Sequence, residues 1–366
     1  MISQENIARS RPLKVLIVDD SEALCLFLRK VISRDPEMEV VGYALDPYEA
    51  RDKIKQMDPD ILTLDVEMPR MDGLTFLRNL MRLRPMPVVM ISSLTAAGAE
   101  VTLDALDAGA VDFMVKRHPQ TDEELDLYSM EIARRVKQAG QIKLVDRNES
   151  NLTNSVASLS EYLSKMNIAH ETGNAPTRVI AIGSSTGGPD ALKHFLKDLH
   201  APDSALLFAQ HMPDRFMKSF ADRLNTWSSF NISIAKPDEK LQAGRGYVAP
   251  GDDHLELTNT AGVLSLLTRK TDLVNGHRPS VDVLFKSVAK AAPAGSIGVL
   301  LTGMGSDGAI GLKQMRSAGA LTIIQDEKSS AVWGMPGRAH EMGAADSVLS
   351  LLQIGPSITS LLKKAA

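Results

Sequence analysis

The sequence predicts an α/β protein with two doubly wound domains. Short apolar, β-branched runs alternate with segments of helical spacing on both sides of a polar stretch, which is typical of parallel sheets covered by helices. The length agrees, because 366 residues are enough for two domains with full cores. The polar stretch is rich in Asn, Ser and Thr and predicts a linker.

The position of the predicted linker sets the expected domain boundaries. We expect domains at residues 13–140 and 178–366, joined by a linker at 141–177 with a short helix near 159–166. Hydrophobic residues make up 44% of the chain and charged residues 23%, as in ordinary globular proteins. The net charge of -4 gives no indication of nucleic-acid or membrane binding.

The sequence also indicates a cytoplasmic protein with no direct membrane insertion. Residues 1–12 are polar and lack the apolar core of a signal peptide, and no apolar run is long enough to span a bilayer. Cys25 is the single cysteine, so an internal disulfide is excluded. It falls in an apolar helical pattern, which favours a buried structural thiol over a nucleophile.

The N-terminal domain alternates strand and helix five times. Each expected strand is an apolar run, and each expected helix repeats apolar residues at helical spacing, the first one behind a capping Ser21. The expected strands are 13–18, 39–43, 61–64, 88–91 and 111–115. The expected helices are 24–32, 47–57, 74–83, 97–108 and 123–138.

Polar residues stand at the ends of these strands, where open parallel sheets bind ligands. They are Asp19, Asp20, Asp65, Ser92 and Lys116. Three carboxylates together repel one another, and a hard cation such as Mg²⁺ resolves that repulsion with oxygen ligands. A carboxylate beside Mg²⁺ can accept a phosphoryl group, whose oxygens a lysine and a hydroxyl can bind.

This block resembles the receiver domain of bacterial response regulators, a flavodoxin-like (βα)5 fold, over residues 13–138. The resemblance implies that Asp65 accepts a phosphoryl group from a histidine kinase. It also implies that Asp19 and Asp20 bind Mg²⁺ together with Asp65. The same resemblance implies that Ser92, Phe113 and Lys116 are switch residues. The family usually has proline after the lysine. Arg117 stands there instead, which leaves the loop geometry open.

The C-terminal domain follows the same alternation, with one expected antiparallel hairpin near 246–267. The expected strands are 179–182, 206–209, 232–235, 244–257 as strand, turn and strand, 262–268, 297–301 and 321–325. The expected helices are 188–196, 216–224, 281–291, 310–318 and 354–362. Residues 326–339, rich in Ser, Gly and Pro, are expected to form a surface loop.

A glycine-rich turn follows the first of these strands. Residues 183–187 fit G-x-S-x-G, a turn that presents a nucleophilic serine at the top of an α/β sheet. Ser185 has the spacing of the nucleophile, and Ser184 is its rival. The alternative is a turn that cradles a phosphate. A Walker-type loop is excluded, because no Lys-Ser/Thr follows.

Two further strand ends supply partners for a serine. His211 could take the serine proton, and Asp307 could fix the histidine tautomer. Asp307 is favoured because three glycines flank it, which suggests close backbone packing. The rivals are His194, His200, His254, His277 and His340 for the base, and Asp282 and Asp326 for the carboxylate.

Four motifs, at 182–189, 210–213, 247–254 and 301–308, together resemble the chemotaxis protein-glutamate methylesterase family over residues 178–362. The resemblance implies a Rossmann-like, mostly parallel α/β domain. It implies five site residues: Ser185 as nucleophile, His211 as base, Asp307 as orienting carboxylate, and Thr186 and Met304 at the oxyanion.

The two resemblances together imply a phosphorylation-regulated serine esterase of chemotaxis. Its substrates would be glutamate methyl esters on chemoreceptor helices, it would also deamidate receptor glutamines, and the ester reaction would need no cofactor. We expect the unphosphorylated receiver to pack over the active site. Alternatives are a hydrolase of another ester and a non-catalytic signalling module. A transcription factor is disfavoured, because no basic helix-turn-helix pattern follows the receiver.

Overall fold

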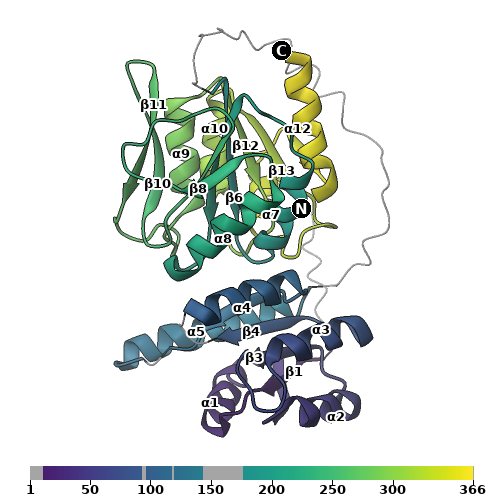
Figure 1. The fold of residues 1–366 in the computed structure, drawn as a ribbon. Coiled ribbons are helices and arrows are strands. Elements are labelled where there is room, and N and C mark those ends of the chain that lie inside the picture. Colours follow the sequence, from purple (N-terminus) through teal and green to yellow (C-terminus); the bar gives the residue numbers. More distant parts are fainter. Residues whose placement is uncertain (1–10, 93–95, 118, 143–175, 366) are drawn as a thin grey trace, which may run out of the picture. The chain divides into compact units, whose positions relative to one another are not determined.

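The computed structural model describes residues 11–92, 96–117, 119–142 and 176–365 (Figure 1). The chain divides into two compact units, Met1–Leu144 and Val145–Ala366. Each unit contains its own sheet and core. Most of the expected linker, including its short helix, lies outside the described residues, so that helix and the domain boundaries remain predictions.

The first unit is a five-stranded sheet in the order β2-β1-β3-β4-β5, with every pair parallel. The strands are β1 (Leu13–Val18), β2 (Met38–Ala44), β3 (Ile61–Asp65), β4 (Val88–Ser92) and β5 (Asp112–Val115). The helices are α1 (Glu22–Ile32), α2 (Pro47–Met57), α3 (Gly73–Leu83), α4 (Ala96–Asp107) and α5 (Asp122–Ala139). The expected alternation of strand and helix is confirmed.

Local capping places the first helix directly behind the carboxylates at the end of β1. The side chain of Ser21 accepts the backbone N–H of Leu24, so α1 begins within three residues of Asp19. α1 packs against α5 over a core that includes the fully buried Cys25. Burial raises the pKa of the Cys25 thiol to about 12, so this cysteine is not a nucleophile at neutral pH.

The second unit contains a seven-stranded parallel sheet in the order β14-β13-β12-β6-β7-β9-β8 and a two-stranded antiparallel sheet, β10-β11. The strands are β6 (Arg178–Ser184), β7 (Ser204–Gln210), β8 (Asn231–Ile234), β9 (Arg245–Val248), β10 (His254–Thr260), β11 (Val263–Arg269), β12 (Ser296–Leu300), β13 (Leu321–Gln325) and β14 (Ser347–Leu349). The helices are α7 (Gly188–Lys197), α8 (Asp214–Trp227), α9 (Val281–Ala291), α10 (Ala309–Ser317), α11 (Met335–Glu341) and α12 (Leu351–Ala365).

Three details of this unit differ from expectation. The hairpin is formed by β10 and β11, whereas β9 joins the parallel sheet. The expected surface loop at 326–339 ends in a helix, α11, with Pro336 in its first turn, where proline is well tolerated. The three-residue edge strand β14 was not predicted, since so short a run carries little periodicity.

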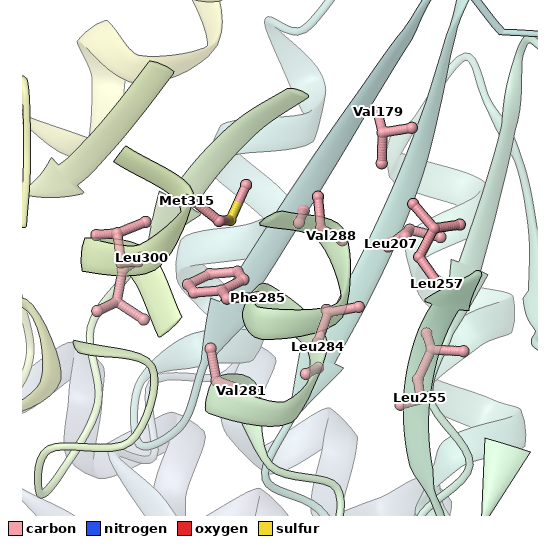
Figure 2. Close-up of a cluster of buried hydrophobic side chains, with 14 of the residues drawn as sticks. Val179, Leu207, Leu255, Leu257, Val281, Leu284, Phe285, Val288, Leu300 and Met315 are labelled. Carbon is pink, nitrogen blue, oxygen red and sulfur yellow. The ribbon is translucent and has the colours of Figure 1, made fainter. Parts of the chain in front are cut away.

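The core of the second unit is built around α9, which contacts β6, β10 and α10. Figure 2 shows Val281, Leu284, Phe285 and Val288 of this helix among side chains from the strands and from α10. All four are fully buried. This packing fixes the N-terminus of α9, which lies at the candidate active site.

No helix within the described part of the chain combines the length and the apolar character that crossing a membrane requires.

Candidate active site

Three adjacent strands bring together the residues that the sequence placed at strand ends. β12, β6 and β7 are neighbours at the centre of the seven-stranded sheet. Ser185 follows β6, His211 follows β7, and Asp307 lies in the loop between β12 and α10. Because the strands are parallel, their carboxyl ends meet at one edge, and the three side chains converge there.

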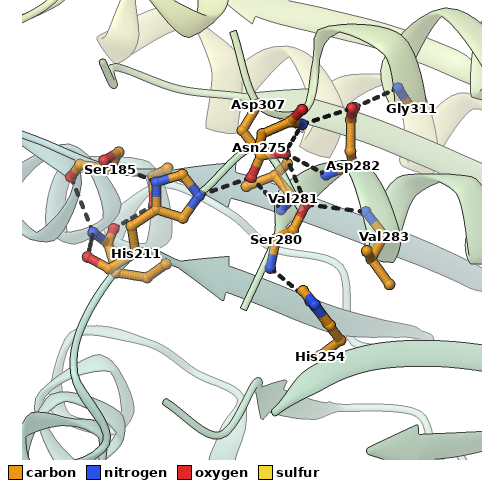
Figure 3. A network of polar contacts seen from close by, with 12 residues as sticks. Ser185, His211, His254, Asn275, Ser280, Val281, Asp282, Val283, Asp307 and Gly311 are labelled. Atoms are coloured by element: carbon orange, nitrogen blue, oxygen red, sulfur yellow. Dashed lines mark hydrogen bonds and ion pairs between the residues drawn. The ribbon is translucent and has the colours of Figure 1, made fainter. Parts of the chain in front are cut away.

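The three side chains form a hydrogen-bonded chain (Figure 3). Nδ1 of His211 lies 3.1 Å from Oγ of Ser185, and Nε2 lies 2.8 Å from Oδ2 of Asp307. The carboxylate can only accept, so Nε2 carries the proton and Nδ1 presents its lone pair to the serine hydroxyl. Turning the ring over would put carbon atoms in both contacts. His211 is therefore oriented as a base for Ser185.

Asp307 accepts several hydrogen bonds besides that of His211. Its carboxylate receives the Asn275 amide at 2.8 Å, the Ser280 hydroxyl at 2.8 Å and the backbone N–H of Val281 at 2.7 Å. The backbone donor belongs to the first turn of α9, where the helix dipole favours an anion. Burial alone would raise the pKa of Asp307, but the bonds to His211 and these donors hold it well below its usual value.

The donors to Asp307 are themselves held in place. His254 is buried, and its Nδ1 accepts the backbone N–H of Ser280 at 3.1 Å while Nε2 donates to the carbonyl of Asp272 at 2.9 Å. His254, a rival for the base, is thus a neutral support of the loop before α9. The roles of Asn275 and Ser280 were missed in the sequence, although a serine before an apolar helical run is a common N-cap signal.

The two adjacent serines have different surroundings. Ser184 ends β6, is buried and donates its hydroxyl to Oε1 of Gln210 at 2.6 Å. Ser185 begins the turn, and its backbone carbonyl accepts Nε2 of the same glutamine at 3.0 Å. Gln210 therefore ties up the rival serine and braces the turn that presents Ser185. The positive φ of this turn, 74°, falls on Gly187 and not on the serine.

Thr186 and Met304 lie on two loops that are joined beside Ser185. The backbone N–H of Ser185 donates to the carbonyl of Thr302 at 3.0 Å, and the hydroxyl of Thr302 donates to the carbonyl of Thr186 at 3.0 Å. A Cβ on Gly303 would lie 2.9 Å from the Ser185 Cβ, so the loop leading to Met304 approaches the serine closely. The oxyanion role of both residues remains a prediction.

The other histidines and carboxylates that the sequence offered as base or orienting residue have different surroundings. His194 is 3.7 Å from Asp190 on its own helix, and His200 and His340 are exposed. The structure places the ring of His277 directly against that of His211. The remaining two rivals are carboxylates with structural partners: Asp282 accepts the backbone N–H of Gly311, and Asp326 bonds to Ser329.

The first unit has a separate acidic cluster at the carboxyl ends of β1 and β3. Carboxylate oxygens of Asp19, Asp20 and Asp65 lie within 4.8 Å of one another. Nζ of Lys116 lies 2.8 Å from Asp65 and 3.0 Å from Asp19. Burial raises the pKa of Asp65 to about 6, with the Asp19 charge adding to it and Lys116 opposing it. This all-oxygen set fits a hard divalent cation such as Mg²⁺.

The expected switch residues Ser92 and Phe113 lie on β4 and β5, the next two strands after β3 in the sheet. Ser92 ends β4 and Phe113 lies on β5, and both are buried. Arg117, where the resemblance led us to expect proline, donates its backbone N–H to the hydroxyl of Tyr128 at 3.4 Å. Tyr128 in turn donates to the carbonyl of Val115 at 3.0 Å. Proline has no N–H to give, so Arg117 ties the loop after Lys116 to α5 in a way that proline cannot.

Known proteins resemble the chain in both units. Residues 180–358 match the CheB methylesterase family, and residues 15–126 match the response regulator receiver domain. A protein-glutamate methylesterase/protein-glutamine glutaminase of Hydrogenovibrio crunogenus is 44% identical over 96% of this chain and 99% of its own length. A protein of the same name from Photorhabdus laumondii is 48% identical over 93% of this chain and 94% of its own length.

Solved structures resemble the two units separately. The CheB methylesterase catalytic domain of Thermotoga maritima is 36% identical, with 50% of this chain and 98% of that domain covered at a TM-score of 0.49. The response regulator domain of Thermotoga maritima CheB is 38% identical, with 36% of this chain and 99% of that domain covered at a TM-score of 0.33.

Proposed function

This chain belongs to the CheB methylesterase family, and we propose that it is a phosphorylation-regulated protein-glutamate methylesterase of chemotaxis. Its substrates are the γ-methyl esters of glutamate on chemoreceptor helices, and its products are glutamate and methanol. The observation that carries the proposal is His211, whose ring is hydrogen-bonded to Ser185 on one side and to Asp307 on the other. This is the arrangement that activates a serine for acyl transfer.

The reaction follows from this geometry. Oγ of Ser185 attacks the ester carbonyl while Nδ1 of His211 takes its proton, and Asp307 stabilises the imidazolium through Nε2–H. Backbone N–H groups of Thr186 and Met304 hold the oxyanion, aided by the N-terminus of α7. Methanol leaves with the proton from Nδ1. Water then hydrolyses the acyl-enzyme with the same base.

The same site can deamidate receptor glutamines. An amide carbonyl has the shape of the ester carbonyl, and the nucleophile and base act on it in the same order. His211 delivers its proton to the leaving nitrogen, so ammonia departs in place of methanol, and hydrolysis of the acyl-enzyme again yields glutamate. Two relatives carry names that include protein-glutamine glutaminase, which supports this second activity.

The first unit supplies the regulation. Asp65 would accept a phosphoryl group from a histidine kinase, and Asp19, Asp20 and Asp65 would hold Mg²⁺, which neutralises charge as the phosphoryl group arrives. Lys116, whose Nζ lies 2.8 Å from Asp65, and Ser92 would bind its oxygens. Movement of Ser92 and Phe113 would then shift the population toward an active form. The proposed partners, a histidine kinase and the cytoplasmic helices of chemoreceptors, would place this activity in the cytoplasm.

Methanol release from methylated chemoreceptor membranes tests the esterase activity. We expect release by the full-length chain, and a loss of roughly 10⁴-fold or more in Ser185→Ala. Ser184→Ala is the matched control, because it removes the neighbouring hydroxyl without touching His211. It should retain activity within about threefold and lose about 1 kcal/mol of stability from the broken bond to Gln210.

The alternatives make different predictions in the same assay. A hydrolase of another ester would release alcohol from small methyl esters but not from receptors. A non-catalytic module would release methanol from neither. Equal loss in Ser184→Ala and Ser185→Ala would contradict the assignment of the nucleophile.

A further inference from the structure

One face of the His211 ring is covered by a second imidazole. The ring of His277 lies parallel to it, with centroids 3.7 Å apart and an angle of 9° between the planes. Both nitrogens of His211 are engaged at the edge of the ring, by Ser185 and Asp307. His277 therefore covers one face of the base, which the triad contacts only at its edge, and it is only half-buried itself.

A tight turn carries His277 to this position. Val274 and His277 exchange backbone hydrogen bonds of 3.1 and 3.0 Å, and the two residues between them have positive φ, 55° for Asn275 and 78° for Gly276. These are the requirements of a type I′ turn, for which Asn-Gly is the preferred pair. The backbone position of His277 is thus set by local geometry.

The same turn also contacts the carboxylate of the triad. The amide of Asn275 donates to Asp307 at 2.8 Å and to Asp282 at 3.0 Å. Two buried carboxylates therefore anchor the turn on one side, and His277 lies against His211 on the other. A turn anchored in this way can hold one ring against another.

The base needs such support because its function depends on the ring plane. A rotation of the His211 ring about its Cβ–Cγ bond would lengthen both the contact to Ser185 and the contact to Asp307. A flat ring at stacking distance blocks that rotation on one face and keeps water from it. It also presents a π-face to the imidazolium that forms when Ser185 attacks.

We propose that His277 is a positioning residue that holds the ring of His211 in the plane joining Ser185 to Asp307. It does not exchange protons with the substrate, and its contribution comes from its flat aromatic shape. The kinetic test of this inference rests on the proposed esterase function, and a second test does not.

The kinetic test uses the full-length chain and methanol release from methylated receptor membranes. We expect His277→Ala to lower kcat roughly 10- to 100-fold, with KM within about twofold, because a misplaced base slows the chemical step without weakening binding. His277→Phe should restore kcat to within about threefold of the original chain, because phenylalanine also stacks. His277→Leu should not, because leucine fills space without a flat face.

His200→Ala is the matched control, since it removes an exposed imidazole that makes no contact with the triad. It should leave kcat and KM unchanged. The inference is wrong if His277→Ala keeps the original kcat, if it changes KM instead of kcat, or if leucine rescues as well as phenylalanine does.

The second test is proton NMR of the full-length chain. The Nε2–H proton of His211 is bonded to a buried carboxylate and should give a downfield resonance, identified by its absence in Asp307→Asn. We expect this resonance in the original chain and in His277→Phe, and its loss by exchange broadening in His277→Ala. An unchanged resonance in His277→Ala would overturn the inference. If the original chain releases no methanol, the proposed function fails, but the resonance still decides the role of His277.

Discussion

Each unit contains a buried carboxylate at the end of a parallel strand or in the loop beyond it. The pKa values of the two carboxylates are shifted in opposite directions from the usual value. Burial raises the pKa of Asp65 to about 6, whereas hydrogen bonds to Asp307 hold its pKa well below the usual range. Both side chains are nearly inaccessible to solvent. Depth of burial therefore does not account for the difference.

The difference lies in the neighbours. Asp307 receives hydrogen bonds from three side chains and from the first turn of α9. Asp65 has Lys116, but the carboxylate of Asp19 lies beside it. A carboxylate that must stay charged to orient a base is surrounded by donors. In the proposed mechanism Asp65 receives a cation and a phosphoryl group, and it is short of positive charge until they arrive.

Among the variants that test this comparison, Asp307→Asn should have the largest effect. The amide places N–H groups where the carboxylate accepts, so it opposes both the Nε2–H of His211 and the backbone donors of α9. We expect methanol release to fall roughly 10³- to 10⁴-fold, as expected when a histidine loses its orienting carboxylate. Hydrogen exchange of β6 and β12 amides should report a loss of about 2 kcal/mol in stability. Full activity in this variant would remove Asp307 from the triad.

The same substitution in the other unit should change stability in the opposite direction. Asp65→Asn removes a buried charge and its repulsion with Asp19, at the cost of one bond to Lys116. Without Mg²⁺ at pH 8, we expect the β1 and β3 amides to gain about 1 kcal/mol of protection, since one pKa unit corresponds to about 1.4 kcal/mol. A loss of protection would mean that Asp65 is as well supported as Asp307.

Asn275→Gly should have a moderate effect on the triad. Glycine keeps the positive φ of the turn and removes only the amide that bonds to Asp307. We expect kcat for methanol release to fall about tenfold, because Asp307 retains its other donors. Asn275→Asp is the charge control, which places a third carboxylate beside Asp307 and Asp282 and should be worse. Full activity in Asn275→Gly would show that the amide bond does not matter.

The pH dependence of Mg²⁺ binding should show the smallest effect. The raised pKa of Asp65 means that its protonated form favours the folded state. This contribution is present below the unfolded pKa of about 3.9 and is lost as pH rises through about 6. Protons should compete with Mg²⁺ in the same range. The rise in Tm caused by Mg²⁺ should therefore be smaller at pH 5.5 than at pH 8, and an equal rise at both would contradict the raised pKa.

The sequence was sufficient for the parts of the site that depend on strand ends. Ser185, His211 and Asp65 each end or directly follow a strand, and parallel strands bring such positions to one edge. It was not sufficient for Asn275, Ser280 and His277. These residues lie in a loop whose path depends on the packing of α9, so their contacts with Asp307 and His211 are tertiary.

Some local signals could have been used further. The pair at 275–276 is a strong turn signal, and a serine at 280 before the apolar run of α9 predicts a cap. The surface loop that the sequence predicts at 326–339 includes Pro336, although proline also occupies the first turn of helices, as it does in α11. The hairpin near 246–267 was expected, but the assignment of β9 to the parallel sheet depends on β7 and β8, which local patterns do not reveal.

The central claim is that phosphorylation of Asp65 controls esterase activity at Ser185. The most direct measurement compares methanol release from methylated receptor membranes with and without a small phosphodonor and Mg²⁺, in the full-length chain and in Asp65→Asn. We predict that the donor raises release by the original chain and leaves Asp65→Asn at the basal rate. Release that is the same with and without the donor, and still lost in Ser185→Ala, would keep the esterase and contradict its control by the receiver.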